Sequence, residues 1–438
     1  MTGQDQRTEK NWWEGSLDYA AISNVGMQRT NNQDAHIEVP AASKRSWYDR
    51  GHFFMVADGM GAHAAGERAS EMAVHLTSQS YIKRTEQDPY SAIRDAIGDA
   101  HLQIKKQGEA DDAFRSMGTT ADVLLLLPEG ALNAHVGDSR TYRLRGGFYE
   151  QLTFDHSLVW ELTRSEKIDP AKLPAKIPKN IITRSLGPSS NPRVDLEGPF
   201  PLKKGDTFLL CSDGLSGQVS DAEMAQVLAL LPPARAAQTL VSLANLSGGP
   251  DNVTVTVVKV LDVPDPSGIL NEERPRARRE PVPPTAWGCL GGTLGLFLMG
   301  TLFLQGEETP LLFPLFSFAA ALGMLAAFFA LARHSLFPRK KELRRHEPFG
   351  RGPYSRVSAE FTSSFAEKLL GYCRKLDEVT RTQITDDLRR TNERIFKQSE
   401  SAFAQHNFRE SIRLSIEYIN CGYGLLWGGN PESKGNKE

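Results

Sequence analysis

Five short runs of apolar and β-branched residues are spaced along the first 260 residues of the chain. Each run is bounded by Gly, Pro, Asp or Asn, which is typical of buried β-strands. The runs are GHFFMVA (51–57), TADVLLLL (120–127), ALNAHVG (131–137), TFLLCS (207–212) and NVTVTVVKV (252–260). Helical patterns lie between them at 64–84, 89–107, 221–231 and 233–246. Because several strands follow one another without an intervening helix, we predict an α+β domain over residues 20–262.

Two long apolar segments follow this domain. Residues 287–304 and 311–332 contain no Asp, Glu, Lys or Arg. As helices they would reach about 27 and 33 Å, against roughly 30 Å of hydrocarbon in a bilayer. A buried core helix can also be apolar on every side, but two adjacent segments of this length favour membrane spans. We therefore predict transmembrane helices at 286–305 and 310–332.

The rest of the chain flanks these two parts. Residues 1–19 are a short N-terminal extension, and residues 263–285 are a Pro/Arg-rich linker that prolines keep partly extended. The Lys- and Pro-rich stretch at 165–180 is predicted to be a surface insertion. Residues 339–438 are predicted to be a basic juxtamembrane segment and a helical region. This region could recruit substrates, self-associate or be a plain helical extension, and its sequence does not distinguish these alternatives.

Composition narrows the class of protein. The chain has 51 Lys and Arg against 53 Asp and Glu, so its overall charge does not suggest nucleic-acid binding. Its four cysteines are far apart in the sequence, which suits a reducing compartment and argues against a disulfide framework or a zinc site. The N-terminus lacks the apolar core of a secretory signal.

Acidic residues recur at or beside the ends of the predicted strands. Asp58 stands in VADGMGAHAAGE, where glycines allow close approach to the backbone. The other four are Asp34, Asp138, Asp213 and Asp251. Each alone is compatible with an ordinary turn, but carboxylates packed together repel one another and favour hard cations such as Mg²⁺ or Mn²⁺. A glycine-rich dinucleotide loop is the alternative for the same stretch, but the glycine spacing is wrong for that fingerprint.

Nine short motifs stand in the order found in one protein family. They are RTNNQD (29–34), DGMG (58–61), GE (66–67), MGTT (117–120), GDSR (137–140), DHS (155–157), ITRSLG (182–187), SDGL (212–215) and DNVT (251–254). Over residues 20–262 the chain resembles the metal-dependent serine/threonine protein phosphatases of type 2C, in their bacterial branch. The resemblance implies a β-sandwich flanked by helices, with a metal centre at one edge.

The resemblance also implies roles for individual residues. Asp58, Asp213 and Asp251 would ligate two Mn²⁺ or Mg²⁺ ions, with Asp58 between them and the Gly59 carbonyl as a further ligand. Asp34 would hold metal-bound water. Asp138 would complete a third, looser metal site, shared with Asp213.

Arg29 matches the family arginine that binds the phosphate, for which a bidentate guanidinium is suited. The implied reaction is hydrolysis of phosphoserine or phosphothreonine in proteins by a hydroxide bridging the two metals. A Ser/Thr protein kinase that the phosphatase opposes is the family expectation for a partner.

The chain departs from the family pattern at three positions. Met60 stands where eukaryotic relatives carry a histidine proposed as proton donor, and His63 lies three residues further on. Gln33 replaces a glutamate and Ala62 replaces a glycine found in many relatives. A catalytically inactive scaffold is the alternative interpretation, but such proteins usually lose metal-binding carboxylates, and all five are present here.

Basic residues predict the topology of the hairpin. RPRARR (274–279) precedes the first span and RKKELRR (339–345) follows the second, whereas the turn between the spans has no Lys or Arg. Lys and Arg near span ends favour the cytoplasmic side. We therefore predict a multi-pass protein of the inner (plasma) membrane, with the phosphatase domain and the C-terminal region in the cytoplasm and the flanking arginines close to lipid headgroups.

Overall fold

The computed structural model describes residues 16–62, 65–166, 181–190, 192–263, 284–305, 310, 312–336, 349–380 and 386–427. Most of the predicted insertion at 165–180 and most of the linker at 263–285 lie outside the described residues, as does His63. The chain divides into two compact units, residues 1–264 together with 348–438, and residues 265–347.

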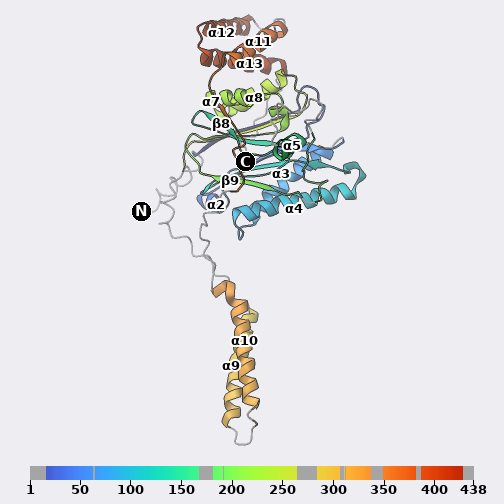
Figure 1. Ribbon diagram of the computed structural model, residues 1–438, viewed down its shortest axis with the longest axis vertical. Coiled ribbons are helices and arrows are strands. Elements are labelled where there is room, and N and C mark those ends of the chain that lie inside the picture. The colour runs from blue at the N-terminus through green and yellow to red at the C-terminus, as the bar shows by residue number, and fades with distance from the viewer. Residues whose placement is uncertain are drawn as a thin grey trace. The chain divides into compact units, whose positions relative to one another are not determined.

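The first unit contains two stacked antiparallel sheets (Figure 1). The strands of sheet A are β1 (Leu17–Asn24), β7 (Arg140–Arg145), β8 (Phe148–Gln151), β10 (Thr207–Cys211), β11 (Val253–Val260) and β12 (Ser355–Ser358). Those of sheet B are β2 (Asp34–Val39), β3 (His52–Met60), β4 (Gly118–Thr119), β5 (Ala121–Leu127), β6 (Gly130–Val136) and β9 (Asp195–Phe200). Sheet A has the order β1-β11-β10-β7-β8-β12, and sheet B has the order β2-β3-β5-β6-β9, with β4 paired to β3.

Helices cover the outer face of each sheet. On sheet B lie α3 (Ala65–Lys83) and α4 (Pro89–Ala110), and on sheet A lie α7 (Asp221–Leu230) and α8 (Pro233–Leu246) (Figure 1). Helix α4 begins at a proline, after Asp88, whose side chain accepts from two backbone N–H groups of its first turn. The shorter helical segments are α2 (Lys44–Arg50), η1 (Asp112–Phe114), α5 (Leu158–Glu166) and α6 (Asp213–Ser216). The α+β class, the five predicted strands and the four predicted helices are confirmed.

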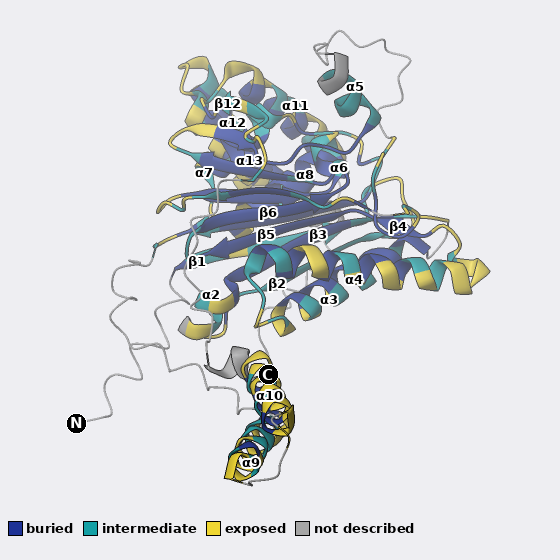
Figure 2. Cartoon of the chain, turned by 60° about the horizontal axis from the view of Figure 1, so that its bottom comes forward, coloured by how far each residue is buried: buried dark blue, intermediate teal, exposed yellow. Residues whose placement is uncertain are grey.

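Strand β3 shows why the predicted strands are apolar on both faces. Phe53 and Met55 pack towards the helices on sheet B, whereas Phe54 and Val56 pack between the two sheets. A strand covered on both faces has a continuous apolar run instead of an alternating pattern. The buried central strands of Figure 2 follow this rule. Because successive side chains alternate, Asp58 lies on the same face of the strand as Phe54 and Val56, towards sheet A.

The C-terminal region packs on the two-sheet part of this unit. It consists of β12, α11 (Ser363–Thr380), α12 (Asp386–Ala404) and α13 (Phe408–Trp427). Phe365 and Leu369 of α11 and Ile412 of α13 belong to the same buried cluster as Met224 of α7 and Leu240 of α8. The predicted helices of this region are confirmed. The strand β12, which extends sheet A beside β8, was not predicted.

The second unit contains two long helices side by side, α9 (Pro284–Gln305) and α10 (Leu312–Leu336). Aromatic rings join them, with the centroids of Phe297 and Phe318 5.3 Å apart. By length and composition both helices are apolar enough to cross a membrane.

Candidate metal centre

Two of the predicted carboxylates lie opposite each other in sheet B. Asp34 is the first residue of β2, and it pairs in antiparallel register with Asp58 near the end of β3. Directly opposed residues on one face of a sheet have Cβ atoms about 5 Å apart, and like charges in such a pair are destabilising. Asp34 and Asp58 are therefore close enough that a positive charge between them would stabilise their ionised forms.

Sheet A brings two more carboxylates to the same edge. Asp213 begins α6 directly after β10, and Asp251 precedes the neighbouring strand β11. The Ser212 hydroxyl donates to Oδ2 of Asp34 at 2.7 Å, which ties the end of β10 to the start of β2. The fifth carboxylate, Asp138, follows β6; its charge acts on Asp58, and the charge of Asp213 acts on Asp138. The structure thus brings all five predicted acidic residues together.

Burial and mutual repulsion disfavour negative charge in this cluster. Burial, opposed by the hydrogen bond from Ser212, raises the pKa of Asp34 to about 7. Burial raises the pKa of Asp58 well above its usual value, and the charge of Asp34 adds to this effect. Burial also raises the pKa of Asp138 to about 7, with a further contribution from Asp213. Bound cations would reverse these shifts by compensating the negative charges.

The donor set fits divalent cations. Within the described residues, Oδ1 of Asp138 is buried and has no hydrogen-bond partner, as a carboxylate oxygen meant for a cation would be. Among the same residues, no group of three or more acidic, histidine or cysteine side chains is arranged so that it could hold a metal ion by itself. Mg²⁺ sites commonly use one or two carboxylates, with water and substrate oxygens completing the shell. An open arrangement of carboxylates suits such sites.

Close approach of three backbone segments explains the glycines around Asp58. A Cβ atom on Gly59 would lie 2.2 Å from the carbonyl oxygen of Gly66 in α3 and 2.4 Å from that of Gln33. A Cβ atom on Gly66 would lie 2.7 Å from the side chain of Gln33. Gly61 has φ near +154°, which favours glycine. The glycines let β3, α3 and the loop before β2 meet beside Asp58. That the Gly59 carbonyl binds a cation stays a prediction.

Arg29 lies at the same edge. Its guanidinium pairs with Oδ2 of Asp251 at 3.0 Å, and its side chain is about half exposed, at 53%. A phosphate group bound by Arg29 would compete with Asp251 for this guanidinium. The structure thus places the predicted phosphate-binding residue beside a predicted metal ligand.

Three of the sequence motifs, DNVT, GDSR and DHS, contain residues whose contacts the sequence alone did not show. Asn252, of the DNVT motif, donates from Nδ2 to the carbonyls of Val25 and Asn31, and its Oδ1 accepts from the N–H of Gln33. Asn252 therefore fixes the loop that carries Arg29. The GDSR and DHS motifs contribute Arg140 and Asp155, described below. No local pattern shows these contacts, because each joins segments far apart in the chain.

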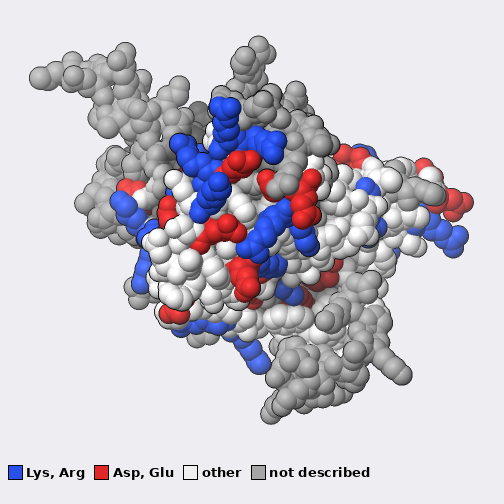
Figure 3. Space-filling model, turned by 90° about the horizontal axis from the view of Figure 1, so that it is seen from above, with Lys and Arg blue, Asp and Glu red and all other residues white. Residues whose placement is uncertain are grey.

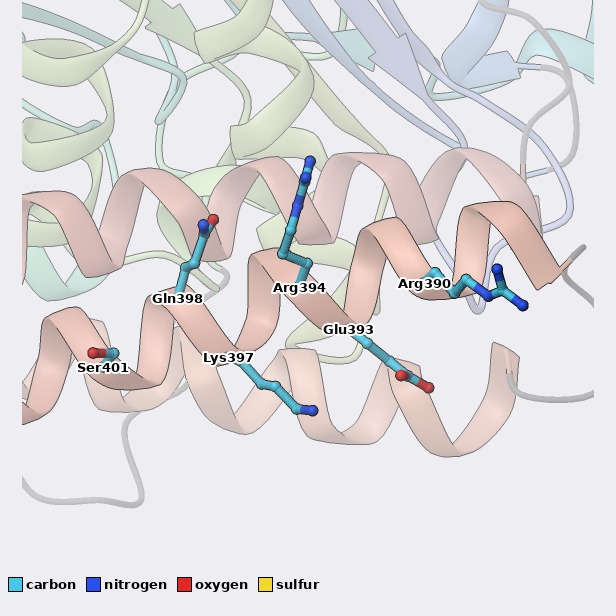
Figure 4. Close-up of a pocket in the computed structure, with 6 residues that line it drawn as sticks. All are labelled: Arg390, Glu393, Arg394, Lys397, Gln398 and Ser401. Atoms are coloured by element: carbon cyan, nitrogen blue, oxygen red, sulfur yellow. The ribbon is translucent and has the colours of Figure 1, made fainter.

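Other grooves of this unit lie away from the carboxylates. One of about 430 Å³ runs along α12 and is lined by Arg390, Glu393, Arg394, Lys397, Gln398 and Ser401 (Figure 4). On the face formed by the tail helices, basic and acidic side chains are interspersed (Figure 3). Several of them are paired, as Arg374 is with Glu400 at 3.1 Å.

The chain is similar in sequence and structure to known protein phosphatases. A family model described as Protein phosphatase 2C matches residues 27–244. The protein phosphatase PhpP of Streptococcus pneumoniae is 38% identical over 250 residues, which are 56% of this chain and 98% of that protein. The crystal structure of the Mycobacterium tuberculosis serine/threonine phosphatase PstP/Ppp is 33% identical, with a TM-score of 0.50 over 56% of this chain and 100% of that one. A structure of the PstP catalytic domain, 33% identical with a TM-score of 0.47 over 56% of this chain and 99% of that one, is in complex with two manganese ions.

The chain belongs to the protein phosphatase 2C family. It is a serine/threonine protein phosphatase, as the order of its motifs indicated, and its bacterial relatives include PhpP and PstP. The family match ends at residue 244, so the apolar hairpin and the C-terminal region are additional to the matched domain.

Proposed function

We propose that the chain is a membrane-anchored phosphatase that uses Mn²⁺ or Mg²⁺ to dephosphorylate phosphoserine and phosphothreonine in cytoplasmic proteins. It would thereby reverse the action of a Ser/Thr protein kinase. The observation that carries the proposal is the gathering of Asp34, Asp58, Asp138, Asp213 and Asp251 at one edge of the β-sandwich.

Each residue has a distinct part in this proposal. Asp58, between the two sheets, would hold both cations, and Asp213 and Asp251 would each hold one of them. When bound, the cations supply Lewis acidity: they activate water and offset charge on the phosphate oxygens. Asp34 would accept a proton or hydrogen bond from the attacking water. Arg29 would bind the phosphate with its two-pronged guanidinium.

Substitution of the carboxylates tests the proposal. Asp213→Asn and Asp251→Asn in the full chain should each lower Mn²⁺-dependent hydrolysis of a phosphopeptide by at least about 100-fold, because a weakly held cation no longer activates water. The matched control is Asp49→Asn, which removes an exposed carboxylate on α2. Calorimetric titration with Mn²⁺ reports binding separately from turnover. Near-normal turnover of either site variant at saturating Mn²⁺ would refute the assignment.

The composition of α9 and α10 supports the membrane anchor. Helix α9 has 22 residues and a mean hydropathy of 1.6, and residues 312–330 of α10 have a mean hydropathy of 2.1. Only 6% and 22% of these segments are buried inside the structure, so their side chains have little protein around them. Apolar helices of this length that are not covered by protein suit the interior of a bilayer.

The packing of the tail supports the proposed topology. Strand β12 follows the hairpin in the chain, yet it pairs with β8, which precedes the hairpin. Both ends of the hairpin must therefore emerge on one side of the membrane. The arginines and lysines flanking the spans favour the cytoplasm for that side. Reporter fusions test this: a cytoplasmic signal from a fusion at Glu307, or an external signal from one at Glu438, would overturn the topology.

A further inference from the structure

Residues 349–359, here called the strap, connect the two sheets. Phe349 exchanges two backbone hydrogen bonds with Gly198 of β9, at 2.6 and 3.1 Å. Further along, β12 pairs with β8, and the N–H of Ala359 donates to the carbonyl of Gly147 at 2.8 Å. One segment of the tail thus binds an edge strand of each sheet.

Glu197 of β9 is the main polar contact of the strap. This carboxylate is 3% exposed, and its Oε2 accepts from the N–H groups of Arg351 and Gly352, each at 3.0 Å. Its Oε1 accepts from the hydroxyl of Tyr354. A Cβ atom on Gly350 would lie 1.7 Å from the carboxylate, so the strap must have glycine there. The strap therefore satisfies a buried charge that would otherwise be costly.

Tyr354 extends from the strap towards the start of α5. Its ring lies edge-on to Phe154, with centroids 5.3 Å apart, and to Trp160 of α5, with centroids 6.4 Å apart. Such edge-to-face pairs are favourable at centroid distances of about 4.5–7 Å. Its backbone N–H donates to the carbonyl of Gln151 at 2.8 Å.

These contacts form a closed ring around Arg140. The side chain of Gln151 donates to Oδ1 of Asp155 at 2.8 Å, and the guanidinium of Arg140 donates to both Asp155 oxygens, to Oδ2 from Nη2 at 2.6 Å. The same guanidinium lies 5.8 Å from the ring centroid of Trp160. Tyr354 contacts both Gln151 and Trp160, and so it completes the ring.

Arg140 lies two residues after Asp138, at the start of β7. Oδ1 of the Asp138 carboxylate has no hydrogen-bond partner among the described residues. Its position depends on the backbone between Gly137 and Arg140. Whatever holds Arg140 therefore also restricts Asp138.

We propose that Tyr354 is a positioning residue for the metal centre: through Gln151, Asp155 and Trp160 it fixes Arg140, and thereby Asp138. The proposal rests on the proposed role of Asp138 as a metal ligand. It gives the tail a function in catalysis, since the tail completes the environment of the looser cation site.

Tyr354→Ala tests the proposal in the full chain, reconstituted in neutral nanodiscs. We expect the Mn²⁺ concentration for half-maximal hydrolysis of p-nitrophenyl phosphate to rise about three- to tenfold, and amide hydrogen exchange in residues 155–163 to become faster. Tyr354→Phe keeps the ring contacts and loses only the hydroxyl bond to Glu197, so it should restore the wild-type Mn²⁺ dependence. Lys368→Gln is the control, because it removes another tail contact, the 2.8 Å ion pair with Glu223, outside the ring.

Three results would overturn the proposal. They are unchanged Mn²⁺ dependence and exchange in Tyr354→Ala, the same defect in Lys368→Gln, and no restoration in Tyr354→Phe. Failure of the proposed function is recognised separately, because wild-type turnover would then not depend on Mn²⁺. Hydrogen exchange in the metal-free protein would still report whether Tyr354 orders residues 155–163.

Discussion

Leu369 provides a measure of how tightly the tail is joined to the phosphatase domain. This residue of α11 is fully buried, at 0% exposed, in the cluster that includes Met224 and Leu240. Leu369→Ala removes three buried carbons, at about 0.8 kcal/mol each. The unfilled cavity adds to this loss, so we expect the free energy of unfolding to fall by about 3–4 kcal/mol. Because the core is shared, the loss should be felt by the phosphatase domain as well as by the tail.

The assay is urea unfolding of the full chain, followed both by loss of phosphatase activity and by hydrogen exchange in β11. Leu369→Ala should shift both transitions to lower urea. Val379→Ala is the control, because Val379 lies in the same helix but is 54% exposed, and its effect should be within about 0.5 kcal/mol. If Leu369→Ala unfolded only the tail and left the activity transition unchanged, the reasoning from a shared core would be wrong.

Three further predictions concern the site and the fold. Arg29→Ala should chiefly raise KM for a phosphopeptide, because the guanidinium binds phosphate in both ground and transition states. Asp138→Ala should chiefly lower kcat. Equal changes of KM and kcat in the two variants would contradict this division of roles. Removal of divalent cations with a chelator should abolish turnover, and Mn²⁺ should restore it. His52 is buried, which lowers its pKa to about 4, and its Nδ1 accepts from the N–H of Ala41 at 3.0 Å, so it must stay neutral when folded. The unfolded state binds this proton more readily, and stability present above pH 6.5 is therefore lost as the pH falls towards 4. The wild type should lose about 2 kcal/mol from this group between pH 7 and pH 5; a His52→Gln variant with the same pH dependence would contradict the assignment.

The apolar pattern found the continuously apolar strands and overlooked strands that contain charged residues, even where these are buried. Strand β7 has the sequence RTYRLR, and its three arginines hide it from a search for apolar runs. Each of these arginines is paired with an acidic side chain: Arg140 with Asp155, Arg143 with Glu150 and Arg145 with Asp206. Strand β12, SRVS, is partly exposed and forms because β8 offers an edge. Neither condition is visible in a local window.

The carboxylates of the site were predicted for a different reason. Asp58 and Asp213 stand at strand ends beside glycines, and the family order of the nine motifs assigned both residues to one metal site. Sequence alone could not show that Asp34 faces Asp58 across a strand pair, since β2 itself was not among the predicted strands. Nor could it find Tyr354, whose contact with Glu197 spans 157 residues.

The pairing of β12 with β8 has a consequence for biosynthesis. Tyr354 leaves the ribosome 157 residues after Glu197, a delay of roughly 10–30 s at ordinary rates of synthesis. During this interval the two apolar helices are synthesised, and the edge strand β8 and the carboxylate of Glu197 lack their partners from the tail. Unpaired edges of this kind invite wrong association. The enzyme would therefore reach its finished form only after both apolar helices have been synthesised, and a chain released before residue 349 would lack the segment that completes it.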